Sequence, residues 1–443
     1  MTPDLLAPLD LAFWNMECDR HPMHLGALGV FTAHSPTAGA HAADLLAVRA
    51  AAVPGLRLRI RDVWQPLAFG GAAREPVPDF DPLDHVRLHA PTADFHAVAG
   101  RLMERPLDRA RPPWEAHVLP GEDGVSFAVL FKFHHALADG LRALKLAAGI
   151  LDPVGPPARA PRAVESPRTP PSDVRGLPGL FPGLVKDALS DVGRALDIGA
   201  SLARSTLGMR PSSALASAPS GTRRTAGAVL DIDDVHRVRK SAGGTVNDVL
   251  IAVVAGALRR WLDERGDGSE GVAPRALVPV SRRRPHTAHP QGNRLSGYLI
   301  PLPVDDPDPL GRLGAVRAAM LRNKDAGPHR GAGALALLAD HVPALGHRLG
   351  GPLVGQAARL WFDILVTSVP LPGPGLRLGG HRLAEVYPFA PLAPGQSLAV
   401  AVSTYRGHAH YGLVADARAV TDLDVFARAV ADEAEALVTA CEH

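Results

Sequence analysis

The sequence predicts an α/β (α+β) fold of two domains, each a mixed sheet with flanking helices. Three observations lead to this prediction. The chain has 443 residues, more than a single hydrophobic core usually holds. A proline-rich stretch at 152–179 interrupts it near the middle. Strand-like and helix-like patterns occur on both sides of that stretch, which therefore separates two units with similar mixed secondary structure.

The first half, residues 1–151, is predicted to be an N-terminal domain. Its clearest strand is GVSFAVLFKFHH, where large apolar residues at every second position show period two up to Phe133. The other elements are predicted in chain order as a helix near 8–18, a strand at 24–31, a helix at 43–53, short strands and turns over 54–120, and a helix at 140–151.

Residues 152–222 are predicted to be a crossover between the domains. Proline prevents regular structure over most of 152–179. Apolar residues recur at helical spacing over 181–208, which predicts a helix lying on the body of the protein. A helix at a lipid surface is the alternative, and its modest basic content disfavours that alternative.

The second half, residues 223–443, repeats the mixed texture and is predicted to be the C-terminal domain. A long helix is expected at 246–265 and a closing helix at 424–440. Strands are predicted at 227–233, 275–281, 292–304, 397–407 and 408–416.

Composition excludes several classes of protein. A net charge of +2 gives no reason to expect a nucleic-acid partner. Cys18 and Cys441 are too few for a disulfide framework or a cysteine-rich metal site. The acidic N-terminus is not a signal peptide, and the apolar run at 249–258 has about half the length of a spanning helix. We therefore expect a soluble, cytoplasmic protein that touches membranes from the surface, if at all.

The stretch FAVLFKFHHALADG at 127–140 is the strongest candidate site. It places His134 and His135 at the end of a strand, where a side chain is held by the sheet yet faces a crevice. A neutral imidazole can accept a hydroxyl proton near neutral pH, with its neighbours setting the ring orientation. Two alternatives remain at this point. The pair could be ordinary loop polar residues in a chain with 20 histidines, or metal ligands, although adjacent histidines in extended backbone point to opposite sides.

HHALADG matches the HHxxxDG motif and so resembles the CoA-dependent acyltransferase superfamily, which includes chloramphenicol acetyltransferase and peptide-synthetase condensation domains. The flanking blocks are similar, in order, to those of the bacterial wax ester synthase/diacylglycerol acyltransferase family. These blocks are LAPLDLAFWNMECDRHPMHLGALGVF (6–31), RPPWEAHVL (111–119), GGTVNDVLIAVVAGALRRWL (243–262) and the segment 275–310. The resemblance implies two chloramphenicol-acetyltransferase-like domains with the active site at their interface.

The resemblance also implies roles for the motif residues. His135 would be the general base that deprotonates the acceptor hydroxyl, and His134 would support it. Asp139 and Gly140 would be structural, with Asp139 paired to an arginine after VPVS. Of the three arginines there, Arg283 is the one we choose.

Four further residues are expected along the substrate channel. Asn247 and Asp248 form the ND motif at the start of a helix, where a structural role is as well supported as a catalytic one, since Thr245 or Asn247 can cap that helix. Trp114 and Gly26 are interpreted most simply as packing positions beside the channel.

The function implied is transfer of a fatty acyl group from acyl-CoA to an alcohol or diacylglycerol, without a cofactor or metal. The partners implied are acyl-CoA, the hydroxyl acceptor and a membrane or lipid-droplet surface. TSVPLPGP at 367–374 departs from the family's SNVPGP-like block, which leaves open a specialised-metabolite hydroxyl or amine as acceptor. Two more functions stay open: a condensation-type enzyme that uses a carrier-bound acyl group, and a non-enzymatic scaffold that binds lipid or protein.

Overall fold

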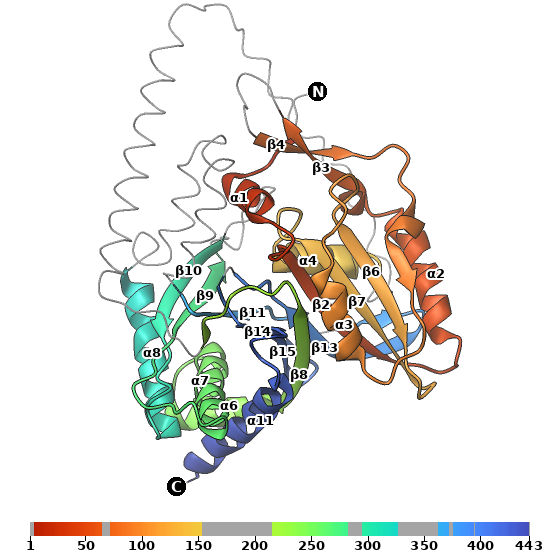
Figure 1. The fold of residues 1–443 in the computed structure, drawn as a ribbon. Coiled ribbons are helices and arrows are strands. Elements are labelled where there is room, and N and C mark those ends of the chain that lie inside the picture. Colours follow the sequence, from red (N-terminus) through yellow and green to blue (C-terminus); the bar gives the residue numbers. More distant parts are fainter. Residues whose placement is uncertain are drawn as a thin grey trace, which may run out of the picture.

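The computed structural model describes residues 4–63, 71–152, 215–281, 295–326, 362–371, 375–393 and 395–442. They form two six-stranded sheets and a small three-stranded sheet, with helices packed around them (Figure 1). Most of the predicted crossover, including its predicted helix, lies outside the described residues.

The first sheet carries the strand that leads into HHALADG. Its central pair is β2 (His24–Thr32) and β7 (Ser126–His134), which run antiparallel with His24 opposite His134. The sheet order is β12-β13-β2-β7-β6-β5. The remaining strands are β12 (Arg377–Leu378), β13 (His381–Phe389), β6 (Trp114–Pro120) and β5 (Val86–Leu88).

The alternating side chains of β7 pack on both faces of this sheet. Phe127, Val129 and Phe131 pack on the face covered by α2 (Ala38–Ala50). Ala128 and Leu130 pack on the other face, against α3 (Phe95–Glu104). Both faces are therefore buried, and β7 is almost entirely inaccessible to water.

The remaining elements of this half surround the motif end of the sheet. They are β1 (Asp4–Leu5), α1 (Pro8–Met16), η1 (Pro54–Arg57), β3 (Leu58–Val63), β4 (Gly71–Pro76), η2 (Pro82–Asp84) and α4 (Gly140–Ala148). β1, β4 and β3 form the small sheet, drawn at the top of Figure 1 beside α1.

The second sheet has the order β10-β9-β11-β14-β15-β8 and is covered on one face by four helices (Figure 1). Its strands are β8 (Arg223–Asp231), β9 (Arg275–Ser281), β10 (Leu295–Pro301), β11 (Ile364–Ser368), β14 (Leu398–Tyr405) and β15 (His408–Asp416). The helices are α6 (Ile232–Ala242), α7 (Val246–Glu264), α8 (Pro309–Ala326) and α11 (Leu423–Ala440).

The two sheets are joined by β13. It lies in the C-terminal half of the sequence but pairs with β2 of the first sheet. It also crosses closely over β15, where Gly412 faces the Pro388 carbonyl oxygen. The predicted division at 152–222, with all of 223–443 in one domain, does not account for this, because β12 and β13 complete the sheet of the first half.

A second contact between the halves is made by α3 and β8. Gly100 of α3 lies against the Arg223 carbonyl oxygen, where a side chain would not fit. The Thr225 hydroxyl of β8 donates to the His96 carbonyl oxygen at 2.7 Å. An apolar layer between the sheets contains residues of both halves, among them Leu28, Phe389 and Val414.

The predicted fold class is confirmed, and most strongly periodic elements lie within a few residues of their predicted bounds. The strand predicted at 227–233 ends earlier, at Asp231, because the Asp231 carboxylate accepts the Asp233 backbone N–H and caps α6. The sequence analysis did not predict α3, α6, α8, β11 or β13.

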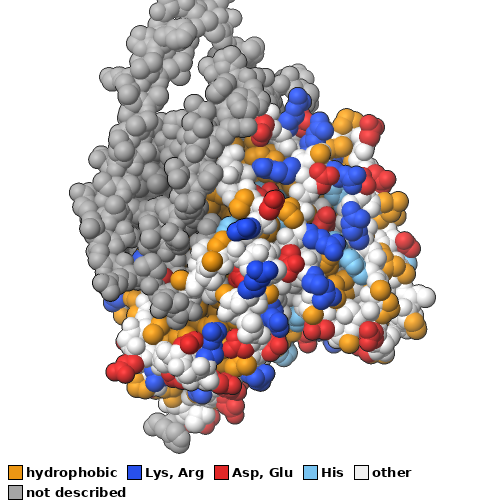
Figure 2. Space-filling view, viewed as in Figure 1, with side chains coloured by type: hydrophobic (Ala, Val, Ile, Leu, Met, Phe, Trp, Pro, Cys, Tyr) orange, Lys and Arg blue, Asp and Glu red, His pale blue; other side chains and the backbone are white. Residues whose placement is uncertain are grey.

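Within the described ranges, no single helix is long and apolar enough to cross a membrane. The bent pair α6–α7 meets the length and composition criteria together, with an angle of 101° between its helices. Most of α7 is buried in the core of the second domain. Side chains of both charge signs are interspersed over the described face shown in Figure 2.

The crossing of β13 over β15 predicts a strict requirement for glycine at position 412. In Gly412→Ala the new methyl group would overlap the Pro388 carbonyl oxygen, a backbone atom that can move only with its strand. We expect the free energy of unfolding to fall by about 3 kcal/mol or more. Thermal and denaturant melts measure this.

Gly314→Ala is the matched control. Gly314 lies exposed within α8, and an added methyl group meets no atom within 4 Å. Alanine there should stabilise the helix by about 0.5–1 kcal/mol. Equal melting of the two variants would contradict the close strand crossing.

Candidate active site

The HHALADG loop begins where β7 ends, at His134, and α4 begins at Gly140. The His135 backbone N–H donates to the Met23 carbonyl oxygen at 2.8 Å, which ties the loop to the start of β2. Arg74 donates to the Ala136 carbonyl oxygen at 3.0 Å and forms a buried ion pair with Asp10 at 2.5 Å. The backbone of the loop is thus held from two sides.

The two histidine rings contact consecutive aromatic residues of α1. The His135 ring stacks on Phe13 with a centroid distance of 4.0 Å. The Trp14 ring meets the His134 ring edge-on at 5.0 Å. His134 is fully buried, whereas His135 is half-buried. Of the two rings, His135 is therefore the one that a substrate could reach.

Burial is the main cause that lowers the pKa of His135 from 6.5 to about 4; His134 contributes in the same direction, and a backbone hydrogen bond and Asp139 oppose the shift. A low pKa means that the ring is neutral at neutral pH, so it can accept a proton rather than already carrying one. This is the protonation state that a general base needs.

His134 faces a buried carboxylate that the sequence analysis missed. Its Nε2 lies 3.4 Å from Glu17 Oε2, and the Nε2 of His24 lies 3.4 Å from Glu17 Oε1. The Met23 backbone N–H also donates to Glu17 Oε1, at 3.3 Å. Glu17 follows the last turn of α1 and was visible in the sequence only as one acidic residue between an apolar helix and a strand.

The histidine neighbours keep Glu17 ionised. Burial alone would raise the pKa of its carboxyl group, but the interactions with His134 and His24 outweigh burial and hold this pKa far below its usual value. Burial lowers the pKa of His24 to about 4, against the opposing effect of Glu17. At neutral pH the cluster therefore combines an anionic Glu17 with a neutral His24.

Asp139 is the N-cap of α4, and its Oδ1 accepts the Arg142 backbone N–H at 2.8 Å. Its predicted partner Arg283 lies outside the described residues, so that ion pair stays a prediction. Gly140 packs on Val369, whose Cγ2 would be 3.2 Å from an added Cβ atom. Since Val369 directly follows β11 of the second sheet, the end of the motif loop lies where the two domains meet.

Asn247 and Asp248 lie in the first turn of α7. Asp248 belongs to a capping box, in which its Oδ2 accepts the Thr245 N–H at 2.7 Å and its own N–H donates to Thr245 Oγ1 at 3.2 Å. Asn247 is half-buried beside it. The capping role expected for Thr245 is thus present, and a role for either residue in a channel stays a prediction.

Trp114 and Gly26 are packing positions. Trp114 is 1% exposed and donates its indole N–H to the Leu56 carbonyl oxygen at 2.7 Å. Gly26 lies against Met103 of α3, whose sulfur would be 3.0 Å from an added Cβ atom. These contacts match the packing interpretation, and a channel beside them stays a prediction.

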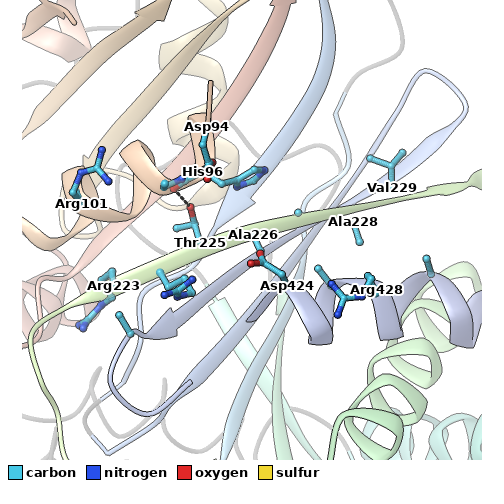
Figure 3. Close-up of a pocket in the computed structure, with 16 residues that line it drawn as sticks. Asp94, His96, Arg101, Arg223, Thr225, Ala226, Ala228, Val229, Asp424 and Arg428 are labelled. Carbon is cyan, nitrogen blue, oxygen red and sulfur yellow. Dashed lines mark hydrogen bonds between the residues drawn. The ribbon is translucent and has the colours of Figure 1, made fainter. Parts of the chain in front are cut away.

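A separate groove of about 660 Å³ lies between α3, β8 and α11 (Figure 3). Its lining includes Arg101 and Arg223 toward one end of the view and Arg428 toward the other, with Asp94 and Asp424 between them. The basic side chains do not converge on one point, and the residues of the HHALADG loop do not line this groove. This groove is therefore distinct from the motif loop, and the catalytic role of the loop stays a prediction. In the described part of the chain, no group of three or more His, Cys, Asp or Glu residues is placed to hold a metal ion.

Sequence comparisons identify relatives over nearly the whole chain. Residues 6–250 match the wax ester synthase/diacylglycerol acyltransferase catalytic domain, and residues 291–437 match the WS/DGAT C-terminal domain. The probable diacylglycerol O-acyltransferase tgs1 of Mycobacterium tuberculosis H37Rv is 31% identical, with 98% of this chain and 95% of the relative covered. The tgs2 protein of the same strain, also named a probable diacylglycerol O-acyltransferase, is 34% identical, with 95% of each covered.

Solved structures agree on the fold. The wax ester synthase/diacylglycerol acyltransferase of Marinobacter aquaeolei VT8 aligns with a TM-score of 0.73 at 23% identity, covering all of both chains. The trichothecene 15-O-acetyltransferase TRI3 of Fusarium sporotrichioides aligns with a TM-score of 0.62 at 11% identity, covering 98% of this chain and 94% of that one.

The fold and the HHxxxDG loop define a two-domain acyltransferase. The catalytic and C-terminal matches together span most of the sequence, and relatives above 30% identity cover almost all of it. The chain belongs to the wax ester synthase/diacylglycerol acyltransferase family.

The lowered pKa of His135 predicts an unusual pH profile. Because the ring is neutral above pH about 4, kcat/KM for acyl transfer should stay level as the pH falls through 6.5, the ordinary histidine pKa. The value of kcat/KM should fall only as the pH approaches the lowered pKa of His135. Initial rates at several pH values, with tryptophan fluorescence to confirm that the protein remains folded, measure this. A halving near pH 6.5 in folded protein would contradict the assignment.

The capping role of Asp139 predicts a stability effect that depends on its side-chain oxygen. Asp139→Ala removes the acceptor for the Arg142 N–H and should lower the free energy of unfolding by about 1–2 kcal/mol from the cap alone. Asp139→Asn keeps an acceptor and should recover most of this loss. Thermal melts compare the variants. A fully stable Asp139→Ala variant with abolished turnover would instead indicate a catalytic role.

Proposed function

We propose that the chain transfers a fatty acyl group from an acyl-CoA thioester to the hydroxyl group of a long-chain alcohol or diacylglycerol, with His135 as the general base. The observation that carries the proposal is the half-buried neutral His135 at the end of β7, beside the junction of the two domains. The names of the relatives supply the substrate class.

The reaction needs one proton acceptor and no covalent enzyme intermediate. The His135 ring takes the proton of the acceptor hydroxyl as its oxygen attacks the thioester carbonyl carbon. The tetrahedral intermediate collapses with cleavage of the carbon–sulfur bond. The imidazolium then returns its proton to the leaving thiolate, so the products are the ester and free CoA. No cofactor or metal enters this scheme.

The acceptor side of the site is expected near residues 367–371, which belong to the TSVPLPGP block that differs from the family's SNVPGP-like block. Val369 contacts Gly140, and its backbone N–H and carbonyl oxygen are held by Val402 and Ser403 of β14. The block is therefore fixed beside the motif loop. The relatives favour diacylglycerol or an alcohol over a specialised-metabolite acceptor or a carrier-bound donor. Association with a membrane or lipid-droplet surface remains an expectation from the family.

A substrate panel tests the proposal directly. Purified protein is incubated with acyl-CoA and, separately, a long-chain alcohol, diacylglycerol, a primary amine and a carrier-bound acyl donor, and CoA release and ester formation are both measured. We expect ester from the alcohol or diacylglycerol. His135→Ala should lower that rate by about a hundred- to ten-thousandfold, because no other group replaces the imidazole as proton acceptor.

Two outcomes would contradict the proposal. Product only from the amine or the carrier-bound donor would indicate amine acylation or condensation-type chemistry instead. Near-normal turnover of a folded His135→Ala variant would show that this ring is not the base.

A further inference from the structure

We propose that Glu17 is a positioning residue for this reaction. Its buried carboxylate orients the His134 ring and, through Met23, holds the backbone of the HHALADG loop at His135. This inference rests on the proposed function and adds a residue that the motif does not contain. Glu17 touches neither substrate nor reacting atoms in this assignment and acts through His134 and Met23.

The first argument is the connectivity of the carboxylate. Glu17 Oε1 accepts the Met23 N–H, and the Met23 carbonyl oxygen accepts the His135 N–H at 2.8 Å. One residue, Met23, thus links the carboxylate to the backbone of the proposed base. The other oxygen, Oε2, lies 3.4 Å from His134 Nε2. Both histidines of the motif are therefore connected to the same acidic group.

The second argument is the orientation of the His134 ring. Its Nδ1 accepts the Ala136 backbone N–H at 3.0 Å, so in the neutral ring the hydrogen is on Nε2. That Nε2–H faces Glu17. The hydrogen bond at Nδ1 and the carboxylate 3.4 Å from Nε2 both favour this ring orientation, and the Ala136 that the ring holds is the residue directly after His135. The orientation of His134 is thereby transmitted to the loop.

The third argument is that the carboxylate has a closed environment of donors. The Glu17 side chain is 6% exposed. The titratable and charged groups around it are His134 and His24 on the sheet, Lys132 farther along β7, and Arg109, whose Nε lies 3.8 Å from Oε2. Arg109 also lies over Trp14, 3.6 Å from the ring centroid, and donates to the Trp14 carbonyl oxygen at 2.6 Å. A buried anion with this many donors is held in a defined position.

Glu17→Gln tests the role without changing the size of the side chain. An amide offers one oxygen acceptor and presents N–H donors on its other side, so it cannot act as an acceptor toward His134 and His24 at once. We expect kcat to fall by about 10- to 100-fold, the range found for residues that orient metal-ligating histidines. KM for acyl-CoA and for the acceptor should stay within about twofold, because Glu17 does not contact either substrate.

Glu115→Gln is the matched control. Glu115 is a second carboxylate beside β7, placed 3.1 Å from His117 Nε2 and 3.5 Å from Lys132 Nζ. Glu115→Gln also removes a carboxylate charge from beside a histidine and a lysine, but His117 and Lys132 lie outside the motif loop. We expect a lower melting temperature in both variants and a lower kcat per folded molecule only in Glu17→Gln.

Chemical rescue distinguishes a positioning role of the carboxylate from a purely structural one. Glu17→Ala leaves space for a small carboxylate among the same donors, so added formate should restore part of kcat. Formate should not restore Glu115→Ala or His135→Ala. If Glu17→Ala does not fold, the kcat and KM values of Glu17→Gln decide the question.

The outcomes separate this inference from the proposed function. An active wild type, an inactive His135→Ala and a Glu17→Gln variant with normal kcat would overturn only the inference. Equal losses of kcat per folded molecule in Glu17→Gln and Glu115→Gln, without formate rescue, would also overturn it. A wild type inactive on every acyl-CoA and hydroxyl acceptor would overturn the proposed function, and the inference with it.

Discussion

The arrangement of the whole molecule depends on β13 pairing with β2. β13 comes from the C-terminal half of the chain, yet it adds to the sheet whose neighbouring pair, β2 and β7, ends at His24 and His134. The same strand crosses β15 of the second sheet at Gly412. One strand therefore fixes the sheet that carries the histidines relative to the other domain. The contact between Gly140 and Val369, at the end of the motif loop, depends on this alignment because the loop follows β7 of the first sheet and Val369 follows β11 of the second.

Local patterns in the sequence predicted the elements whose burial is periodic. β7 alternates apolar residues on two buried faces, and α7 is a long apolar helix with a capping box at Thr245 and Asp248, so both were predicted nearly to the residue. β13 was not predicted, because its sequence HRLAEVYPF mixes charged, polar and aromatic residues without strict alternation. Its pairing is decided by a strand more than 300 residues away, which no local pattern reports.

The same reasoning explains what could be predicted of the site. The pair His134–His135 was found because its chemistry is contiguous in sequence. The two rings contact neighbouring residues of α1, Phe13 and Trp14, which the sequence did not indicate. Glu17, His24 and Phe13 were not found, because they come from α1, the residue directly after it and β2, and they meet the loop only after β2 pairs with β7. The packing of Trp114 and Gly26 followed from residue type, whereas the predicted pair of Asp139 and Arg283 stays a prediction because Arg283 lies outside the described part of the chain.

The two adjacent histidines have different environments, and the difference explains how the motif loop can lie beside a buried anion and still provide a neutral base. His134 points to the Glu17 side, where the carboxylate lies beside groups from two segments of the chain, His134 at the end of β7 and Met23–His24 at the start of β2. His135 points to Phe13, whose ring offers no charge or hydrogen bond that would favour an imidazolium. The carboxylate therefore stabilises the supporting ring without protonating the proposed base. A carboxylate placed directly against His135 would raise its pKa, so separating the two by one residue of strand keeps the base neutral while its backbone stays anchored.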